Sequence, residues 1–193
     1  MKKKIALSIA AIALVICCAV GGTLAWLTDQ TGPVVNTFTV GNIDITLTES
    51  EGVTSSNPQA GTFKMVPGNT IEKDPKVTVE AGSEACWLFV KVEESTNFDS
   101  FLTYTMADGW TQLTKDKDGN DITDLVFYRE VAAPTTDQAF AVLADDQVTV
   151  KNTVTKADMD GLTSSTLPTL TFTAYAVQKD NIADEATAWA EIA

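Results

Sequence analysis

Residues 86–94 read CWLFVKVEE, and this stretch decides the fold class. Large hydrophobic side chains occupy consecutive positions from Trp87 to Val90, so a strand built from them presents an apolar surface on both faces. Such a strand is typical of the centre of a sheet that other elements cover on both sides. We therefore predict that residues 86–94 form a central strand.

Segments typical of short strands recur along the rest of the chain. They are rich in Thr, Val, Ile, Phe and Tyr and are separated by turn residues. The clearest lie at 37–48 and 170–177, and residues 110–114 and 125–131 read as the two strands of a hairpin. Roughly eight to ten strands without βα alternation predict an all-β fold, an antiparallel β-sandwich of the jelly-roll or immunoglobulin-like type.

Two positions are expected to interrupt this strand pattern. Pro75 lies inside the predicted strand at 71–79 and has no N–H to donate, so this strand lies at a sheet edge or starts only after Pro75. At Gly41 the apolar residues change parity, and a β-bulge there would return them to one face. The residues concerned are Phe38, Val40, Ile43, Ile45 and Leu47. We read the polar stretch 49–61 as a loop and 62–66 as a short strand.

Helical spacing of apolar residues is found near the C-terminus. Ile182, Ala186, Trp189 and Ile192 would lie on one side of a helix. We therefore predict a short amphipathic C-terminal helix at 184–192, with Trp189 buried in the core. One further helical turn is expected at 157–162.

The first 29 residues are typical of an export signal. Three lysines precede the uncharged run 5–28, which we expect to form an N-terminal signal helix. Thr23 and Ala25 are the small pair that a signal peptidase recognises, so cleavage is predicted between Ala25 and Trp26. The predicted parts of the chain are a signal peptide, 1–25, and a single β-sandwich domain, 26–193.

Two other fates of this segment stay open. Its apolar stretch is long for a cleavable signal, so it could remain as a membrane anchor. A lipid anchor at Cys17 or Cys18 fits less well, because a lipoprotein signal has a small residue before the cysteine and Ile16 precedes Cys17. If cleavage occurs, the protein contacts the membrane only through the signal segment before it is removed.

The charge of the mature chain excludes some partners. The signal segment takes three lysines and no acid with it, so 10 basic and 26 acidic residues remain. A chain with this excess of acids does not bind the phosphates of nucleic acids or an anionic membrane surface. The acidity indicates a protein that is soluble outside the cell.

Three motifs in the N-terminal half form a set. The first is Gly-Gly-Thr-x-Ala with a nearby Asp, the second is Asn-Thr-Phe-x-x-Gly-x-Ile, and the third is a Pro-Gly turn before a strand at 65–79. The residues of the first two are Gly21, Gly22, Thr23, Ala25, Leu27, Asp29, Asn36, Thr37, Phe38, Gly41 and Ile43. Together they resemble the TasA and camelysin (CalY) family of exported Gram-positive proteins. The resemblance implies an extracellular β-sandwich, a signal peptidase of the SipW type and, in some members, fibres of the biofilm matrix.

Catalytic chemistry is sparse because the chain contains no histidine. This excludes Ser-His-Asp and Cys-His sites and zinc sites with histidine ligands, including HExxH. No Gly-rich motif for nucleotide phosphates occurs. Cys86 is the one cysteine left after cleavage and lies in an apolar run, so we expect a buried structural thiol. We expect no enzyme activity, no cofactor and no metal.

Acidic residues are the remaining candidates for a site. The pairs Glu93–Glu94 and Asp145–Asp146 could serve glycosidic acid–base catalysis, but neighbours on a strand point to opposite faces. A cluster at 116–124 offers the hard oxygen ligands that Ca²⁺ prefers. Its spacing does not match an EF-hand, and a hairpin turn explains the same residues. These residues are Asp116, Asp118, Asn120, Asp121 and Asp124.

Three classes of function are compatible with these features. The sequence favours a secreted structural protein of the cell surface or extracellular matrix that self-associates into fibres. The alternative is a monomeric adhesion or binding module, which should show a groove with exposed aromatic residues such as Trp110 or Tyr128. A hydrolase, the third class, would need converging carboxylates in a cleft.

The assembly hypothesis rests on the segment 26–40. It carries Pro33, lacks a long apolar run and leads directly into the first predicted strand. Such an extended segment can add to an exposed sheet edge of a neighbouring subunit, with Val34, Val35 and Phe38 at alternate positions. The simpler possibility is that it pairs with its own sheet.

Overall fold

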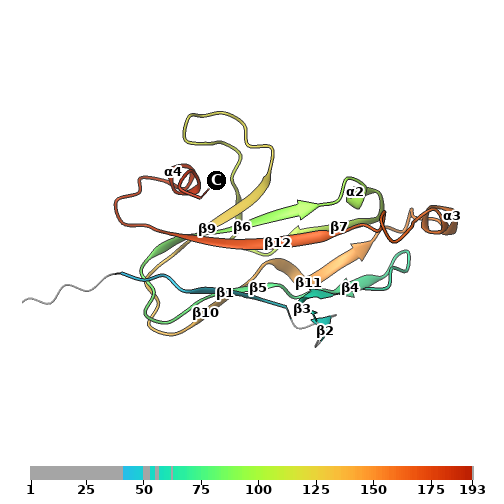
Figure 1. Ribbon diagram of the computed structural model, residues 1–193, viewed down its shortest axis with the longest axis horizontal. Helices are drawn as coiled ribbons and strands as arrows, with labels where there is room; N and C mark the ends of the chain where they lie inside the picture. The colour runs from blue at the N-terminus through green and yellow to red at the C-terminus, as the bar shows by residue number, and fades with distance from the viewer. Residues whose placement is uncertain (1–40, 50–52, 55–56, 62, 193) are drawn as a thin grey trace, which may run out of the picture. The chain divides into compact units, whose positions relative to one another are not determined.

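Antiparallel β-strands form most of the described chain and pack in two layers (Figure 1). The computed structural model describes residues 41–49, 53–54, 57–61 and 63–192. All of them belong to the second of two compact units, Val40–Ala193. The predicted signal helix, the predicted cleavage site and the residues of the assembly hypothesis, Val34, Val35 and Phe38, therefore fall outside the described residues. These three residues are called the donor residues below. Within the described ranges, no helix is long and apolar enough to cross a membrane. The predicted all-β sandwich is confirmed.

The first layer is a four-stranded antiparallel sheet. Strand β6 (Cys86–Glu94) lies between β12 (Leu170–Gln178) and β9 (Leu125–Val131), and β8 (Thr111–Gln112) pairs with the other side of β9. The stretch predicted as a central strand is thus flanked on both sides. The predicted hairpin is confirmed by the pairing of β8 with β9.

The second layer consists of two three-stranded sheets that lie end to end, because two stretches of the chain run from one sheet into the other. The first has the order β1 (Ile45–Thr48), β5 (Lys76–Val79), β10 (Gln138–Ala141). The second has the order β4 (Thr70–Glu72), β11 (Leu143–Val150), β7 (Leu102–Met106). Because β4 leads into β5 and β10 leads into β11, the two sheets form one bent layer opposite β6 and β12 (Figure 1).

Asp145 and Asp146 lie where this layer bends. On one side of the bend Ala141 pairs with Lys76, and on the other side Gln147 pairs with Glu72. The strand that carries the aspartates therefore has two more residues between these pairs than the strand opposite. Both aspartates have positive φ, 56° and 54°, and Asp tolerates this region better than most residues. The pair forms a bulge in the strand and does not converge on a common acid–base site.

Three expectations about the strands can be compared with the structure. β5 is an internal strand that starts directly after Pro75, which is the second of the two arrangements predicted for the proline. The predicted loop at 49–61 instead contains a hairpin of β2 (Val53–Thr54) and β3 (Asn57–Gly61), and residues 63–66 form no strand. Main-chain pairing needs no apolar alternation, so the polar sequence gave no sign of this hairpin. The bulge expected at Gly41 depends on preceding residues that lie outside the described ranges.

Strand β6 is apolar on both faces because each face packs on a different core. One face lies against the second layer, and its buried members are Cys86, Leu88, Val90 and Val92, which pack with Val77 and Val79 of β5. The opposite face carries Trp87 and Phe89, which pack with Leu113, Val126 and Trp189. Burial of both parities explains the continuous apolar run.

The predicted C-terminal helix is confirmed as α4 (Glu185–Trp189), which covers the outer face of β6. Its first turn is capped by Asp184, whose carboxylate accepts a hydrogen bond from the N–H of Thr187 at 2.8 Å. The Trp189 ring centre lies 5.3 Å from that of Phe89 and 5.6 Å from that of Tyr175. Trp189 is therefore a core residue, as predicted.

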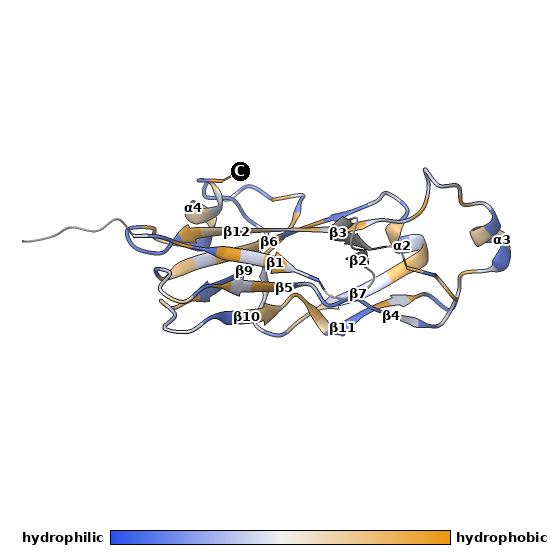
Figure 2. Ribbon diagram, turned by 60° about the horizontal axis from the view of Figure 1, so that its bottom comes forward, coloured by the Kyte–Doolittle hydropathy of each residue, from blue (hydrophilic) through white to orange (hydrophobic). Residues whose placement is uncertain are grey.

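The remaining core closes the other end of the sandwich. Here α2 (Phe98–Phe101) packs with β7 and β11, and Phe98 and Val150 are almost completely buried. The helical turn predicted at 157–162 is α3 (Lys156–Asp160), which begins with a capping box at Thr155. Figure 2 shows hydrophobic stretches on β1 and β5 and a mostly hydrophilic α3.

Candidate functional site

A groove of about 860 Å³ opens between the two layers, beside strands β1 and β12. Both are edge strands. Among the described strands, β1 pairs only with β5, and β12 pairs only with β6 over nine residues. Within the described residues, these two edges at the mouth of the groove have no further strand partner, and an edge of this kind can accept main-chain hydrogen bonds from another strand.

The walls of the groove combine apolar side chains with polar ones, the latter including Ser164, Ser165 and Thr169 near its α3 end. The inward-facing side chains of β12 are Leu170, Phe172 and Ala174, and those of β1 are Ile45 and Leu47. Between them lie Ile71, Leu102 and Val148 from the second layer. A groove with this lining fits alternate apolar side chains of an extended segment.

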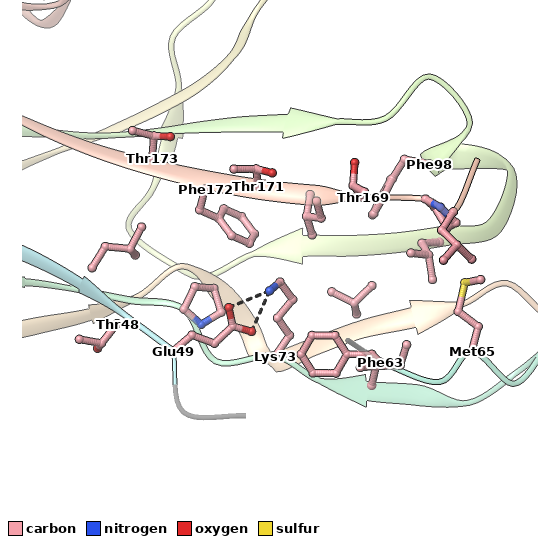
Figure 3. A pocket seen from close by; sticks show the side chains of 18 of the residues that line it. Thr48, Glu49, Phe63, Met65, Lys73, Phe98, Thr169, Thr171, Phe172 and Thr173 are labelled. Atoms are coloured by element: carbon pink, nitrogen blue, oxygen red, sulfur yellow. Dashed lines mark hydrogen bonds and ion pairs between the residues drawn. The ribbon is translucent and has the colours of Figure 1, made fainter. Parts of the chain in front are cut away.

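An ion pair occupies the middle of this groove (Figure 3). The Lys73 ammonium donates to both carboxylate oxygens of Glu49, at 2.7 and 2.8 Å. The two side chains are only 12% and 15% exposed. The same ammonium lies 5.3 Å from the ring centre of Phe63 and 5.7 Å from that of Phe172, close enough for cation–π attraction. The pair ties the end of β1 to the segment between β4 and β5.

Sequence reasoning missed this groove. Glu49 and Lys73 are 24 positions apart, and neither belongs to a motif. Their meeting depends on the antiparallel pairing of β1 with β5, which no local pattern encodes. The predicted donor residues Val34, Val35 and Phe38, and the predicted recognition residues Thr23, Ala25 and Trp26, lie outside the described residues.

The acidic cluster at 116–124 is organised as a turn. One carboxylate oxygen of Asp116 accepts hydrogen bonds from the N–H groups of Asp118 and Asn120 at 2.9 and 2.8 Å, and the other accepts from the Asn120 amide at 3.0 Å. These bonds, first that from the Asn120 side chain, hold the pKa of Asp116 below its usual value. The Lys115 ammonium lies 2.6 Å from Asp121, and that of Lys91 lies 2.9 Å from Asp124.

We expect calcium to leave the stability of the protein unchanged, because the Asp116 oxygens already accept hydrogen bonds from the turn. The thermal unfolding midpoint should be the same in EDTA and in millimolar CaCl₂. A ligand at 100 times its Kd adds about 2.7 kcal/mol to stability, which moves the midpoint by several degrees. A rise of that size with Ca²⁺, absent with Mg²⁺, would contradict the prediction.

The other candidate residues are committed to packing. Glu94 accepts a hydrogen bond from the Tyr104 hydroxyl at 2.7 Å. The Trp110 indole N–H donates to the carbonyl of Ala141 at 2.8 Å. The Tyr128 hydroxyl donates to Glu185 at 3.1 Å. Trp110 and Tyr128 are half-buried, and each has a hydrogen-bond partner within the chain.

Cys86 is fully buried in the core, and burial raises the pKa of its thiol to about 11. At pH 8 the fraction of Cys86 in the reactive thiolate form is therefore about 100-fold smaller than for an exposed cysteine. We expect Ellman's reagent to leave the folded mature protein unlabelled over hours and to label one thiol promptly in guanidinium chloride. Rapid labelling under native conditions would show that Cys86 is accessible.

The described residues do not form a site for a catalytic zinc ion. Such a zinc site uses three protein ligands, most often including histidine, and the chain has no histidine. In the part of the chain that the structure describes, no group of three or more Cys, Asp or Glu side chains is placed to hold a metal. The one thiol there, Cys86, is enclosed by hydrocarbon.

Comparison with known proteins gives one match. The family described as camelysin metallo-endopeptidase matches residues 1–127. No curated protein and no solved structure matches the chain. The family description implies a metal ion, and the described residues, with no histidine in the sequence, do not offer the three-ligand site that a catalytic zinc ion uses. Since the match covers well over half of the sequence, it confirms the resemblance seen in the N-terminal motifs, and the chain belongs to the camelysin family.

Proposed function

We propose that this protein is an exported structural protein of the bacterial cell surface or biofilm matrix, and that its subunits assemble into fibres. In this proposal the segment 26–40 of one copy lies along the edge of β12 in the next copy, over the β1–β12 groove. The observation that carries the proposal is the edge of β12, nine residues long, which no other described strand pairs with and which borders a groove with apolar side chains from both layers. Long open edges of this kind invite pairing with another chain.

The donor segment matches the groove in its pattern of side chains. Successive residues of an extended strand point to opposite faces, so Val34, Asn36 and Phe38 share one face. Val35 lies on the other face, and the expectation that all of Val34, Val35 and Phe38 fill alternate positions is narrowed here to Val34 and Phe38. With the first set inward, two apolar residues flank one polar residue. The groove has the same order, with the Glu49–Lys73 pair between apolar walls.

The direction of the chain favours a contact between copies. The described chain starts at Gly41 and enters β1 at the end of the sandwich opposite α3, whereas residues 164–174 of the groove lie toward α3 (Figure 1). A neighbouring copy can supply a strand to the groove without a reversal of the chain. Contacts of this head-to-tail type continue into a filament unless their rotation closes a ring.

Export precedes assembly in this proposal. A signal peptidase of the SipW type would cut between Ala25 and Trp26, which frees the donor segment as the mature N-terminus. The intact mass of protein recovered from the culture medium should correspond to residues 26–193. A product that begins at Met1 and stays in the membrane would contradict this step.

We also infer that the protein does not act as a peptidase. The donor set described above offers no histidine and no three-ligand site among the described residues. Membership in a family described as metallo-endopeptidases does not by itself assign an activity to each member. The proposed role needs only the fold and its open edge.

A peptide of residues 26–40 tests the proposed site directly. Added to protein that starts at residue 36, it should shift backbone amide resonances of β12 and β1 in NMR spectra. The peptide with Val34→Asp should bind at least about tenfold more weakly, because a charge would enter an apolar groove. The peptide with Val35→Asp is the matched control and should bind nearly normally. Shifts confined to other strands, or no shifts at all, would overturn the proposed site.

A further inference from the structure

Arg129 lies at the seam on the other side of the sandwich, where β8 and β10 are the sheet edges. It is the only arginine in the sequence. Its guanidinium carbon lies 3.9 Å from the ring centre of Phe140 on β10 and 5.2 Å from that of Trp110, which precedes β8. Arg129 itself is on β9 and pairs with Leu88 in the sheet register. The side chain thus joins residues of both layers.

This guanidinium has no acidic partner in the described part of the molecule. The chain carries 26 acidic residues against 13 basic ones. In every ion pair between described residues the cation is a lysine, and none of the described carboxylates pairs with Arg129. Its Nε is buried and has no hydrogen-bond partner among the described residues. Partial burial of an unpaired charge costs stability, and burial lowers the pKa of this guanidinium. Packing alone would be served better by an apolar side chain.

The surroundings hold the guanidinium in one place. Trp110 is fixed by the hydrogen bond from its indole N–H to Ala141. Gly109 has a φ of +88°, which favours glycine, and a Cβ at that position would lie 2.9 Å from Arg129 Nη2, so the guanidinium packs directly against the backbone of this turn. Two aromatic rings and a glycine turn form a seat that orients the N–H groups before anything binds.

We propose that Arg129 is a docking site for one carboxylate side chain of a second copy of this protein. The planar N–H fork of arginine matches a carboxylate with two parallel hydrogen bonds. A second copy offers such groups, because the acids outnumber the bases two to one and at least half of them lack a cation of their own. The site lies at the β8–β10 edges, away from the β1–β12 edges used by the donor segment. This inference rests on the proposed self-association.

Three variants of the mature protein test the proposal. Arg129→Met keeps a long side chain between the rings and removes the charge, so the unfolding midpoint should stay equal or rise while the association constant from sedimentation falls about tenfold or more. Arg129→Lys should also weaken association, because an ammonium cannot form the fork. Lys156→Met is the control, since it removes one charge from an exposed helical pair with Asp160. It should leave association unchanged.

Two results of this series would overturn the proposal. One is an Arg129→Met protein that unfolds several degrees earlier yet associates normally, which would make the arginine structural. The other is an equal loss of association in Lys156→Met, which would mean that the loss of one positive charge anywhere on the protein weakens association. If the Met variant does not fold, the experiment on the unaltered protein described next decides the question.

NMR separates this proposal from the proposed function. A single arginine gives a single Nε–Hε resonance, which reports on Arg129 in the mature protein even if no filaments form. A blocked tetrapeptide with one glutamate should move this peak, and the glutamine version should not. The proposal fails if both peptides have the same effect, or if inorganic phosphate moves the peak at lower concentration than the glutamate peptide does. If the peak moves as expected but the protein never associates, both the fibre proposal and the docking of a second copy fail; if the protein forms filaments but the peak does not move, the docking at Arg129 alone fails.

Discussion

We expect mature protein that lacks residues 26–35 to stay folded and to form no filaments. The deletion removes Val34 and Val35 from the proposed donor but leaves the described strands intact, since these begin at Ile45. Circular dichroism and the thermal midpoint should match those of the full mature chain, and electron microscopy should show single particles. The loss of filaments should be complete, because every contact of a head-to-tail assembly uses the same donor.

Point substitutions make this experiment specific to the groove. Val34→Asp should abolish filaments almost as fully as the deletion, because it places a carboxylate against apolar walls. Val35→Asp changes the same charge one position away, on the face that points out of the groove. It should permit filaments. Filaments formed equally by both variants, or by the deletion protein, would show that the segment is not the donor.

We expect Phe89→Ala to lower the free energy of unfolding by about 3–5 kcal/mol. Phe89 is completely buried, and its ring centre lies 5.3 Å from that of Trp189 and 6.4 Å from that of Tyr128. Removing the ring would leave a cavity between β6 and α4 and separate the helix from the sheet. Denaturant unfolding followed by tryptophan fluorescence measures the change.

Leu167→Ala is the matched control for this substitution. Leu167 is 47% exposed, so its truncation should change the free energy of unfolding by less than about 0.5 kcal/mol. A loss below about 1 kcal/mol in Phe89→Ala would mean that α4 does not form the second cover of β6. A large loss in the control would place Leu167 in the core of the folded protein.

The parts of the fold that depend on periodicity could be predicted from the sequence. Residues 86–94 are apolar at both parities because the second layer covers one face of β6 and α4 covers the other. The helical spacing of the apolar residues around Trp189 predicts a helix at 184–192, and α4 lies within this range. In both cases the buried surface is formed by residues close together in the sequence, so it produces a recognisable apolar pattern.

Other features leave no such trace. The hairpin of β2 and β3 is polar, and its strands are held by main-chain pairing. The bend at Asp145 and Asp146 needs two residues with positive φ, which their identity permits but does not demand. The adjacent acids could equally have been a solvated turn or an acid–base pair.

The candidate site is the least predictable part of the molecule. The groove joins residues from five separate stretches of the chain, and Glu49 meets Lys73 only after β1 pairs with β5. The seat of Arg129 likewise joins two separate segments, one with Gly109 and Trp110 and the other with Phe140. The sequence suggests Val34 and Phe38 as residues of the proposed donor segment, but it contains no sign of the groove that would receive them.

Electron microscopy of the purified mature protein, residues 26–193, tests the central claim most directly. The sample should be followed over a range of protein concentration, pH and salt. We predict unbranched filaments whose amount rises with protein concentration and which vanish when excess peptide 26–40 occupies the grooves. A protein that stays monomeric at high concentration under all these conditions, with no accessory protein restoring assembly, would contradict the claim.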